Sequence, residues 1–149
     1  MAVGDLQFYT TGLDKLTNGF SWASGDVRVL LVTSSYTFDP EHNDVADITN
    51  ELSGGNYARL VIGNKVRTKN TTDHRIQYTA DPAIFPLLGL AAGTPTKIVF
   101  FDQAGGADAN RELLAAMTLT GTAPNGTDYT VVFPSGLVFY IGRTTTYTP

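Results

Sequence analysis

Short apolar runs recur along the chain and are separated by residues that favour turns. The run at 26–34 is apolar on both faces and follows Ser24-Gly25, which predicts a central strand buried on both sides. The run at 97–102 predicts a second central strand. Further strands are expected at 57–62, 65–68, 74–79, 111–120, 128–133 and 136–141. About seven or eight short strands with little helix predict a mainly β chain, an antiparallel β-sandwich or barrel-like domain.

The segments between these runs give more local expectations. Gly63-Asn64 predicts a hairpin between 57–62 and 65–68, and Pro124-Asn125-Gly126 predicts another hairpin turn. Proline cannot donate to a strand ladder, so Pro82 and Pro86 make 81–90 an apolar loop or edge segment over one end of the core. The glycine-rich stretch 103–110 is expected to be a flexible, exposed loop, and a helical turn is expected at 45–48.

A chain of 149 residues has the length of one domain, which we divide into three parts. Residues 1–25 form an N-terminal arm or short helix, because Leu6, Leu13, Leu16 and Phe20 could share one helical face. Residues 26–142 form the β core. Residues 143–149 form a C-terminal arm without an apolar period, and we expect one or both arms to order on a neighbouring subunit.

The predicted core consists of apolar residues in the middle of strands. They are Val29, Leu31, Ile98, Phe100, Val132, Leu137 and Phe139. Residues 111–117 have the composition of a helix, but they lie between two strand signals and are expected to form a strand. Trp22 stands just before the first core strand, where it is interpreted as a lid on the core in preference to a ligand platform.

Composition and charge narrow the functional classes. Only 16% of the residues are charged, the net charge is −4, and the ten Lys and Arg residues form no extended patch, which argues against nucleic-acid binding. No cysteine is present, so disulfides and thiolate chemistry are excluded. The N-terminus lacks the pattern of a secretory signal, and no apolar stretch is long enough to span a bilayer, so no membrane partner is expected.

The sequence also offers little catalytic chemistry. Asp39, Glu41, Asp44 and Asp47 could surround a hard cation, but the EF-hand spacing is absent and a solvated loop is the preferred interpretation. The two histidines, 42 and 74, lie on different elements, too few for a zinc site. Glycine-rich turns lack the phosphate-binding spacing. We therefore expect no enzyme activity, no catalytic residue, no metal and no cofactor.

Several motifs in order along the chain carry a resemblance to a known family. They are VLLVTSSYT at 29–37, DITNELSG at 47–54, NYAR at 56–59, IVFFD at 98–102, ELLA at 112–115 and FPSGL at 133–137. In these motifs the chain resembles small virion proteins of tailed bacteriophages. It departs from their pattern at 81–90, where two prolines replace a strand that contains tryptophan.

The resemblance implies a structural virion protein, assembled in the bacterial host cytoplasm. The preferred role is that of a decoration (cement) protein, which binds the major capsid protein or other virion subunits from the outside of the capsid. A homo-oligomer is expected, with a trimer as one option. A tail or tail-tip protein and a carbohydrate-binding β-sandwich module are the alternatives. Trp22, Tyr36, Phe38 and Tyr147 are the candidate interface residues, and Tyr147 lies in the expected C-terminal arm.

Overall fold

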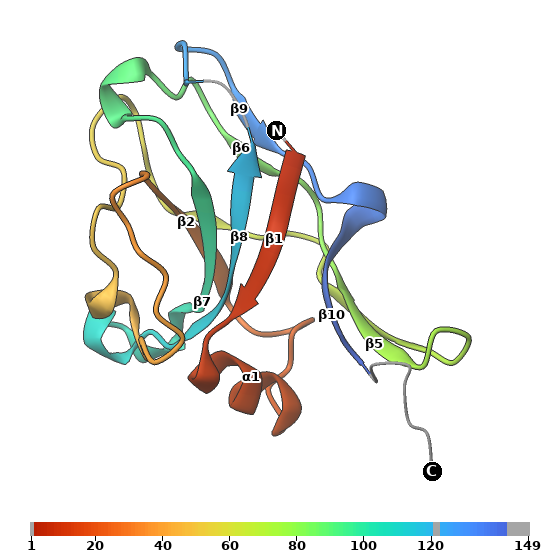
Figure 1. Cartoon of the computed structure of the whole chain (residues 1–149). Helices are drawn as coiled ribbons and strands as arrows, with labels where there is room; N and C mark the ends of the chain where they lie inside the picture. Colours follow the sequence, from red (N-terminus) through yellow and green to blue (C-terminus); the bar gives the residue numbers. More distant parts are fainter. Residues whose placement is uncertain (1, 121–122, 143–149) are drawn as a thin grey trace.

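The computed structural model describes residues 2–120 and 123–142, and it is mainly β with antiparallel sheets in a sandwich-like arrangement, as expected (Figure 1). In chain order, with η for a 3-10 helix, its elements are β1 (Ala2–Phe8), α1 (Thr10–Thr17), β2 (Val27–Val32), η1 (Val45–Asp47), β3 (Leu60–Val61), β4 (Val66–Asn70), β5 (Arg75–Thr79), β6 (Ala83–Phe85), η2 (Leu90–Ala92), β7 (Lys97–Asp102), η3 (Gln103–Gly105), η4 (Asp108–Asn110), β8 (Leu113–Thr120), β9 (Tyr129–Val131), η5 (Pro134–Gly136) and β10 (Leu137–Gly142).

A five-stranded antiparallel sheet in the order β1-β8-β7-β2-β3 forms the centre of the molecule. Nearly all side chains of β2, β7 and β8 are buried, because both faces of the sheet are covered. This confirms the two central strands expected at 26–34 and 97–102. The strand expected at 111–120 is confirmed as well, because pairing with β7 and β1 overrides its helical propensity.

One face of the central sheet packs against two smaller sheets, β10-β5-β4 and β6-β9. Trp22 lies in the middle of this main core. Its ring centroid is 5.1 Å from that of Phe139 and 5.8 Å from that of Tyr78, both edge to face. Its indole N–H donates to the carbonyl of Thr79 at 3.0 Å. Trp22 is thus the core residue that the sequence suggested, with its one polar atom satisfied.

The opposite face of the sheet is covered by the long segment between β2 and β3. Tyr36 and Val45 from this segment join Tyr9 and side chains of β2, β7 and β8 in a second apolar cluster. The hydroxyl groups of Tyr9 and Tyr36 are 2.9 Å apart, so the covering segment is tied to the chain next to β1. The helical turn expected at 45–48 is confirmed as η1.

The N-terminal region differs from the expectation. Residues 2–25 do not form a free arm, because β1 is an edge strand paired with β8. The helix is confined to α1, where Leu16 is buried and Leu13 is 40% exposed. Helix α1 packs closely on β8 through Gly12, where an added Cβ would lie 2.1 Å from the carbonyl oxygen of Leu114. The C-terminal arm at 143–149 lies outside the described residues.

Neither predicted hairpin forms. Gly63-Asn64 makes a turn, with Asn64 at φ 46°, but β3 pairs with β2 and β4 pairs with β5, so this turn connects two sheets. The segment that holds Pro124 likewise passes from β8 to β9, which belong to different sheets. The glycine-rich stretch 103–110 contains two 3-10 turns, η3 and η4.

The segment 81–90 contains a short strand with buried side chains. Strand β6 pairs with β9, and its Ala83 and Phe85 side chains are buried. Pro82 and Pro86 immediately flank the strand, where a missing N–H disturbs no ladder. The expectation of an edge segment that covers one end of the core is therefore confirmed.

Five of the seven predicted core residues are buried: Val29, Leu31, Ile98, Phe100 and Phe139. Val132 is instead 46% exposed, because its neighbours Val131 and Phe133 point inward and side chains alternate along an extended chain. Leu137 is partly exposed, because the pairing of β10 with β5 shifts register between Leu137 and Phe139.

The contribution of each apolar strand residue to the free energy of unfolding should depend on how far its side chain is buried. We expect Leu31→Ala and Phe100→Ala each to lower the free energy of unfolding by about 2–5 kcal/mol, through lost burial and the cavity left behind. The half-exposed Val132→Ala should cost less than about 1 kcal/mol. Urea unfolding followed by fluorescence measures all three. Equal costs for Val132→Ala and Leu31→Ala would contradict the observed strand phase.

Candidate functional site

The aromatic residues proposed as interface contacts are used inside the chain. Trp22 is fully buried, and Tyr36 is 3% exposed between the Tyr9 hydroxyl and Nδ1 of His42. Phe38 is half-buried against the Tyr9 ring, with centroids 4.8 Å apart. Trp22 and Tyr36 are therefore not free to bind a partner, which corrects the expectation for these two residues, whereas Phe38 keeps part of its surface exposed. Tyr147 lies outside the described residues.

The acidic loop, residues 39–47, is held by its own carboxylates. The Asp44 side chain accepts the Ala46 N–H at 3.0 Å, and the Asp47 carboxylate accepts the backbone N–H of Asp44 at 3.3 Å, as part of a capping box around η1. The Asp47 carboxylate also accepts the Asn43 N–H at 2.8 Å. The Asn43 N–H contributes most to lowering the pKa of Asp47. Within residues 2–120 and 123–142, no group of three His, Cys, Asp or Glu side chains is placed to hold a metal ion.

Two ion-pair networks fix other loops to the central sheet. The Arg59 guanidinium bonds both carboxylate oxygens of Glu51, at 2.8 and 2.7 Å, and reaches Asp108 at 2.7 Å. It also lies over the Phe101 ring. The hydrogen bonds that Arg59 donates to Glu51 raise the pKa of Arg59, and the hydrogen bonds that it donates to Asp108 lower the pKa of Asp108. This network joins the segment before β3 to η4.

The second network anchors α1. Lys15 contacts the carboxylates of Glu112 and of Asp102, the latter at 3.0 Å. Burial by itself would lower the pKa of Lys15, but the hydrogen bonds with Glu112 and Asp102 raise it. Asp102 is 6% exposed, so this pair links the helix to the end of β7. In both networks Lys15, Arg59 and their carboxylate partners are paired within the chain.

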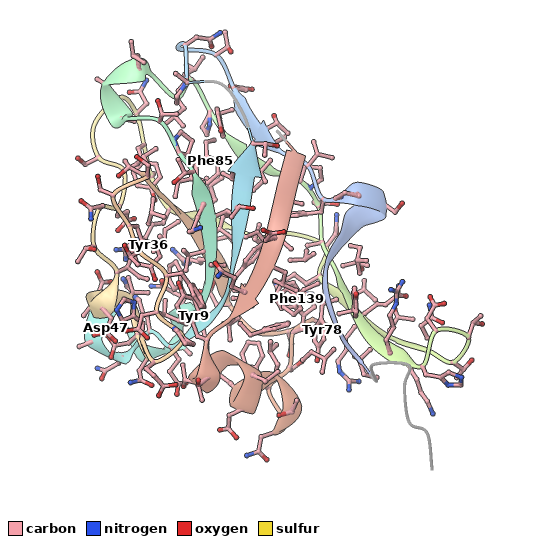
Figure 2. All side chains as sticks on the ribbon, viewed as in Figure 1. Tyr9, Tyr36, Asp47, Tyr78, Phe85 and Phe139 are labelled. Carbon is pink, nitrogen blue, oxygen red and sulfur yellow. The ribbon has the colours of Figure 1, made fainter. Side chains whose placement is uncertain are left out.

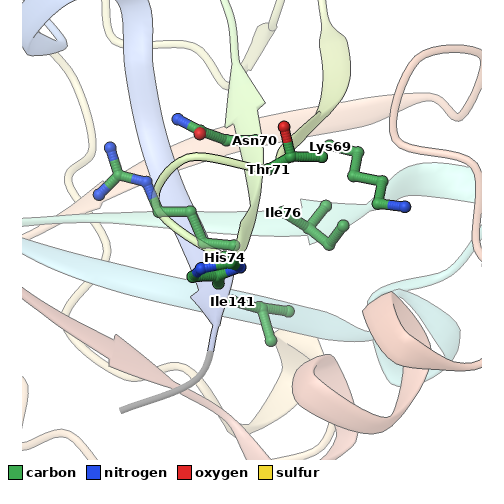
Figure 3. Close-up of a pocket in the computed structure, with 7 residues that line it drawn as sticks. Lys69, Asn70, Thr71, His74, Ile76 and Ile141 are labelled. Atoms are coloured by element: carbon green, nitrogen blue, oxygen red, sulfur yellow. The ribbon is translucent and has the colours of Figure 1, made fainter. Parts of the chain in front are cut away.

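A basic surface lies on the small sheet that contains β4 and β5. Residues 65–75, which comprise Lys65, β4, the turn after it and the first residue of β5, form what we call the basic hairpin. It contains Lys65, Arg67, Lys69 and Arg75 but only one acidic residue, Asp73. Next to it is a hollow of about 500 Å³, which Figure 3 shows in close-up. The hollow is lined by Lys69, Asn70, Thr71, His74, Arg75, Ile76 and Ile141.

A second exposed surface is apolar. We define the apolar end by four side chains in β6, in the segment between β6 and β7, and directly after β9: Ile84, Leu87, Leu90 and Val132, which are 50%, 58%, 67% and 46% exposed. The register of β6 with β9 puts Ile84 opposite Thr130, so Ile84 and Val132 share the outer face. The Leu87 N–H donates to Asp128 at 3.1 Å, which holds this segment beside the start of β9.

Sequence reasoning missed both surfaces. The alternating basic residues at 65, 67 and 69 were visible as a charge pattern, but their common face depends on the pairing of β4 with β5. To predict the apolar end, one would have to know which side chains of β6 and β9 point outward. The prolines on either side of β6 gave no sign of that strand in the sequence. Among the described residues, no helix is long and apolar enough to cross a bilayer.

The chain was compared with protein-family models, with curated proteins and with solved structures. No protein-family model matches the chain, and no curated protein and no solved structure is similar to it.

The Arg59 network makes stability depend on pH. The lowered pKa of Asp108 in the folded state means that its ion pair stabilises above the ordinary aspartate pKa of about 4 and is lost as pH falls through the lowered value. Asp108→Asn should therefore destabilise the protein at neutral pH, and the difference from wild type should shrink in acid. Urea unfolding across the pH range measures this. Asp14→Asn, at an exposed carboxylate, is the control. A difference for Asp108→Asn that is constant with pH would contradict the role of this pair.

The carboxylates of Asp44 and Asp47 are already engaged by backbone N–H groups. We therefore expect EDTA to leave the melting temperature of the purified protein unchanged, and added Ca²⁺ to leave it unchanged as well. Scanning calorimetry with and without chelator measures this. A fall of several degrees with EDTA that Ca²⁺ reverses would show that the acidic loop holds a cation.

Proposed function

We propose that this protein is a non-enzymatic structural subunit that decorates the outside of a tailed-phage capsid and binds the major capsid protein. Two separate lines support the proposal. The motifs from 29–37 to 133–137 resemble small phage virion proteins. The β-sandwich-like fold with an apolar end suits a subunit whose work is to contact other subunits.

The apolar end is the observation that carries the binding role. Four large apolar side chains are about half or more exposed, and they lie in β6, in the segment after it and directly after β9: Ile84, Leu87, Leu90 and Val132. Single exposed apolar residues are ordinary, but a group at one end of a protein is typical of an interaction surface. Burying such residues against a partner removes apolar area from water and stabilises the complex.

The ionisable groups favour binding over catalysis. An active site holds groups with shifted pKa values in a cleft that a substrate can enter. Here the shifts at Lys15, Asp47, Arg59 and Asp108 arise from partners within the chain. The shift at Tyr129, whose pKa burial raises to about 12, comes from packing against the core.

A carbohydrate-binding module has less support, because Trp22, the proposed stacking platform, is fully buried. A tail or tail-tip location remains the alternative within the virion. The apolar end would serve either place, since it specifies a protein contact and not the identity of the partner.

Capsid binding tests the proposal. We expect Ile84→Glu with Val132→Glu to abolish co-sedimentation with purified capsids that lack the protein, because two charges would enter an apolar contact. Leu13→Glu, at an exposed leucine of α1, is the matched control and should bind normally. Circular dichroism checks that all variants fold. Wild-type binding by the double variant would refute the role of the apolar end.

Immunogold labelling of intact virions is the second measurement. Label on the head supports decoration, and label on the tail supports the alternative. Virions without any label would overturn the proposal of a virion protein.

A further inference from the structure

The charges of this protein are segregated along the chain. The basic hairpin has four of the ten Lys and Arg residues and one acid, so it carries +3 while the rest of the chain carries −7, for a net −4. By contrast, residues 29–58 contain five acidic residues and neither Lys nor Arg. Such blocks of opposite sign produce an uneven field that orients approaching molecules.

The basic hairpin has cationic groups without internal partners. Among the described residues, Arg67 and Lys69 form no ion pair or hydrogen bond through their side chains, unlike Arg59 and Lys15. Arg67 pairs in register with Tyr78 and Lys69 with Ile76, and opposed residues in an antiparallel pair share a face. Arg67 and Lys69 thus lie on the same face as the buried Tyr78, along the free edge strand of this sheet.

The hollow beside these cations has an apolar floor. Ile76 and Ile141 are half-buried and in register on neighbouring strands. Lys69 and His74 stand at its rim (Figure 3). Arg75 is partly engaged elsewhere, because it pairs with Asp73 at 3.2 Å and lies over the Tyr140 ring. A hollow with this lining fits a polypeptide segment that presents carboxylates beside small apolar groups.

The acidic loop is such a segment, and it is held in a defined conformation. Asp39 and Glu41 are exposed, and the capping box fixes the following turn. The Thr10 N–H donates to the carbonyl of Pro40 at 2.8 Å, and the Thr10 hydroxyl donates to Glu41 at 2.9 Å. A loop fixed in this way loses little conformational entropy when it binds.

The two surfaces cannot meet within one molecule. The acidic loop belongs to the cover over one face of the central sheet, and the basic hairpin belongs to the sheet packed on the opposite face. Figure 2 shows Asp47 at the left edge of the molecule, while Tyr78, in strand β5 beside the hairpin, lies to the right of the central sheet. Complementary surfaces that point in opposite directions favour a head-to-tail contact between copies.

We propose that the basic hairpin of one copy binds the acidic loop of a second copy of this chain. The inference rests on the proposed function as a surface-binding subunit and names one of its partners. Two acidic proteins repel each other in most orientations, so this contact also selects the orientation. Charges of this kind act mainly on the rate and the specificity of association, while the floor of the hollow contributes apolar contact.

Sedimentation velocity of the purified protein tests the proposal. We expect concentration-dependent self-association at low salt that weakens as salt is added, because exposed charges are screened beyond about 10 Å at 0.1 M. Arg67→Glu with Lys69→Glu should weaken the association roughly tenfold or more, and so should Asp39→Lys with Glu41→Lys.

Combining the four substitutions in one chain is the decisive experiment. The combined variant keeps the wild-type net charge of −4 and exchanges the signs at the four substituted positions, so contacts between these positions on neighbouring copies are attractive again. Association should return towards the wild-type value. Asp5→Lys with Asp14→Lys matches the charge change of the loop variant at other exposed positions and should not weaken association.

The results of these experiments distinguish the proposed contact from its alternatives. Restoration in the combined variant supports the contact. A wild-type protein that is monomeric at every salt concentration overturns it, as does association unaffected by either reversal. Loss with the hairpin reversal alone overturns the acidic loop as the occupant. Capsid binding through the apolar end is measured separately, so its failure and the failure of self-association can be told apart.

Discussion

The structure depends on covering both faces of the strands β2, β7 and β8. Their nearly continuous apolar sequences leave no polar face for solvent, so the sheet is stable only between two covers. One cover consists of the two smaller sheets with Trp22 at the centre of the packing, and the other is the segment that contains Tyr36 and Val45. Among the described residues, most large aromatic side chains are used in these covers and their anchors, and Tyr140, at 49% exposed, is an exception.

The charged networks have a complementary role, since they fix the ends and loops of this layered arrangement. Arg59 connects Glu51 with Asp108, and Lys15 connects α1 with Asp102. Pairs at this degree of exposure contribute modestly to stability, but they define where the loops lie. The basic hairpin is different, because Arg67 and Lys69 are left without an internal counterion among the described residues. This contrast separates charges that hold the fold from charges available to a partner.

The sequence was sufficient to predict the elements whose signal is strong and local. The runs at 26–34 and 97–102 are apolar on both faces, and only a doubly covered strand satisfies such a run. The pairing of strands was harder to predict. The Gly63-Asn64 turn indicates that the chain changes direction, but it does not indicate which strand pairs with the strand after the turn. Strand β1 was missed because AVGDLQF alternates weakly, and its place is set by pairing with β8. Val132 was misplaced by one residue of strand phase, which reverses the face of a side chain.

The candidate surfaces could be predicted still less, for a related reason. An interface depends on what remains exposed after folding, and the sequence-based choice of Trp22, Tyr36 and Phe38 selected side chains that the core needs. The charge blocks were readable, but their opposite placement follows from the two covers. Since the acidic loop and the basic hairpin belong to opposite covers of the central sheet, the packing of these covers sets the angle between them. In a head-to-tail contact this angle decides whether successive copies close into a ring or continue as an open chain. The packing of the core would therefore set the symmetry of the assembly as well as the stability of the subunit.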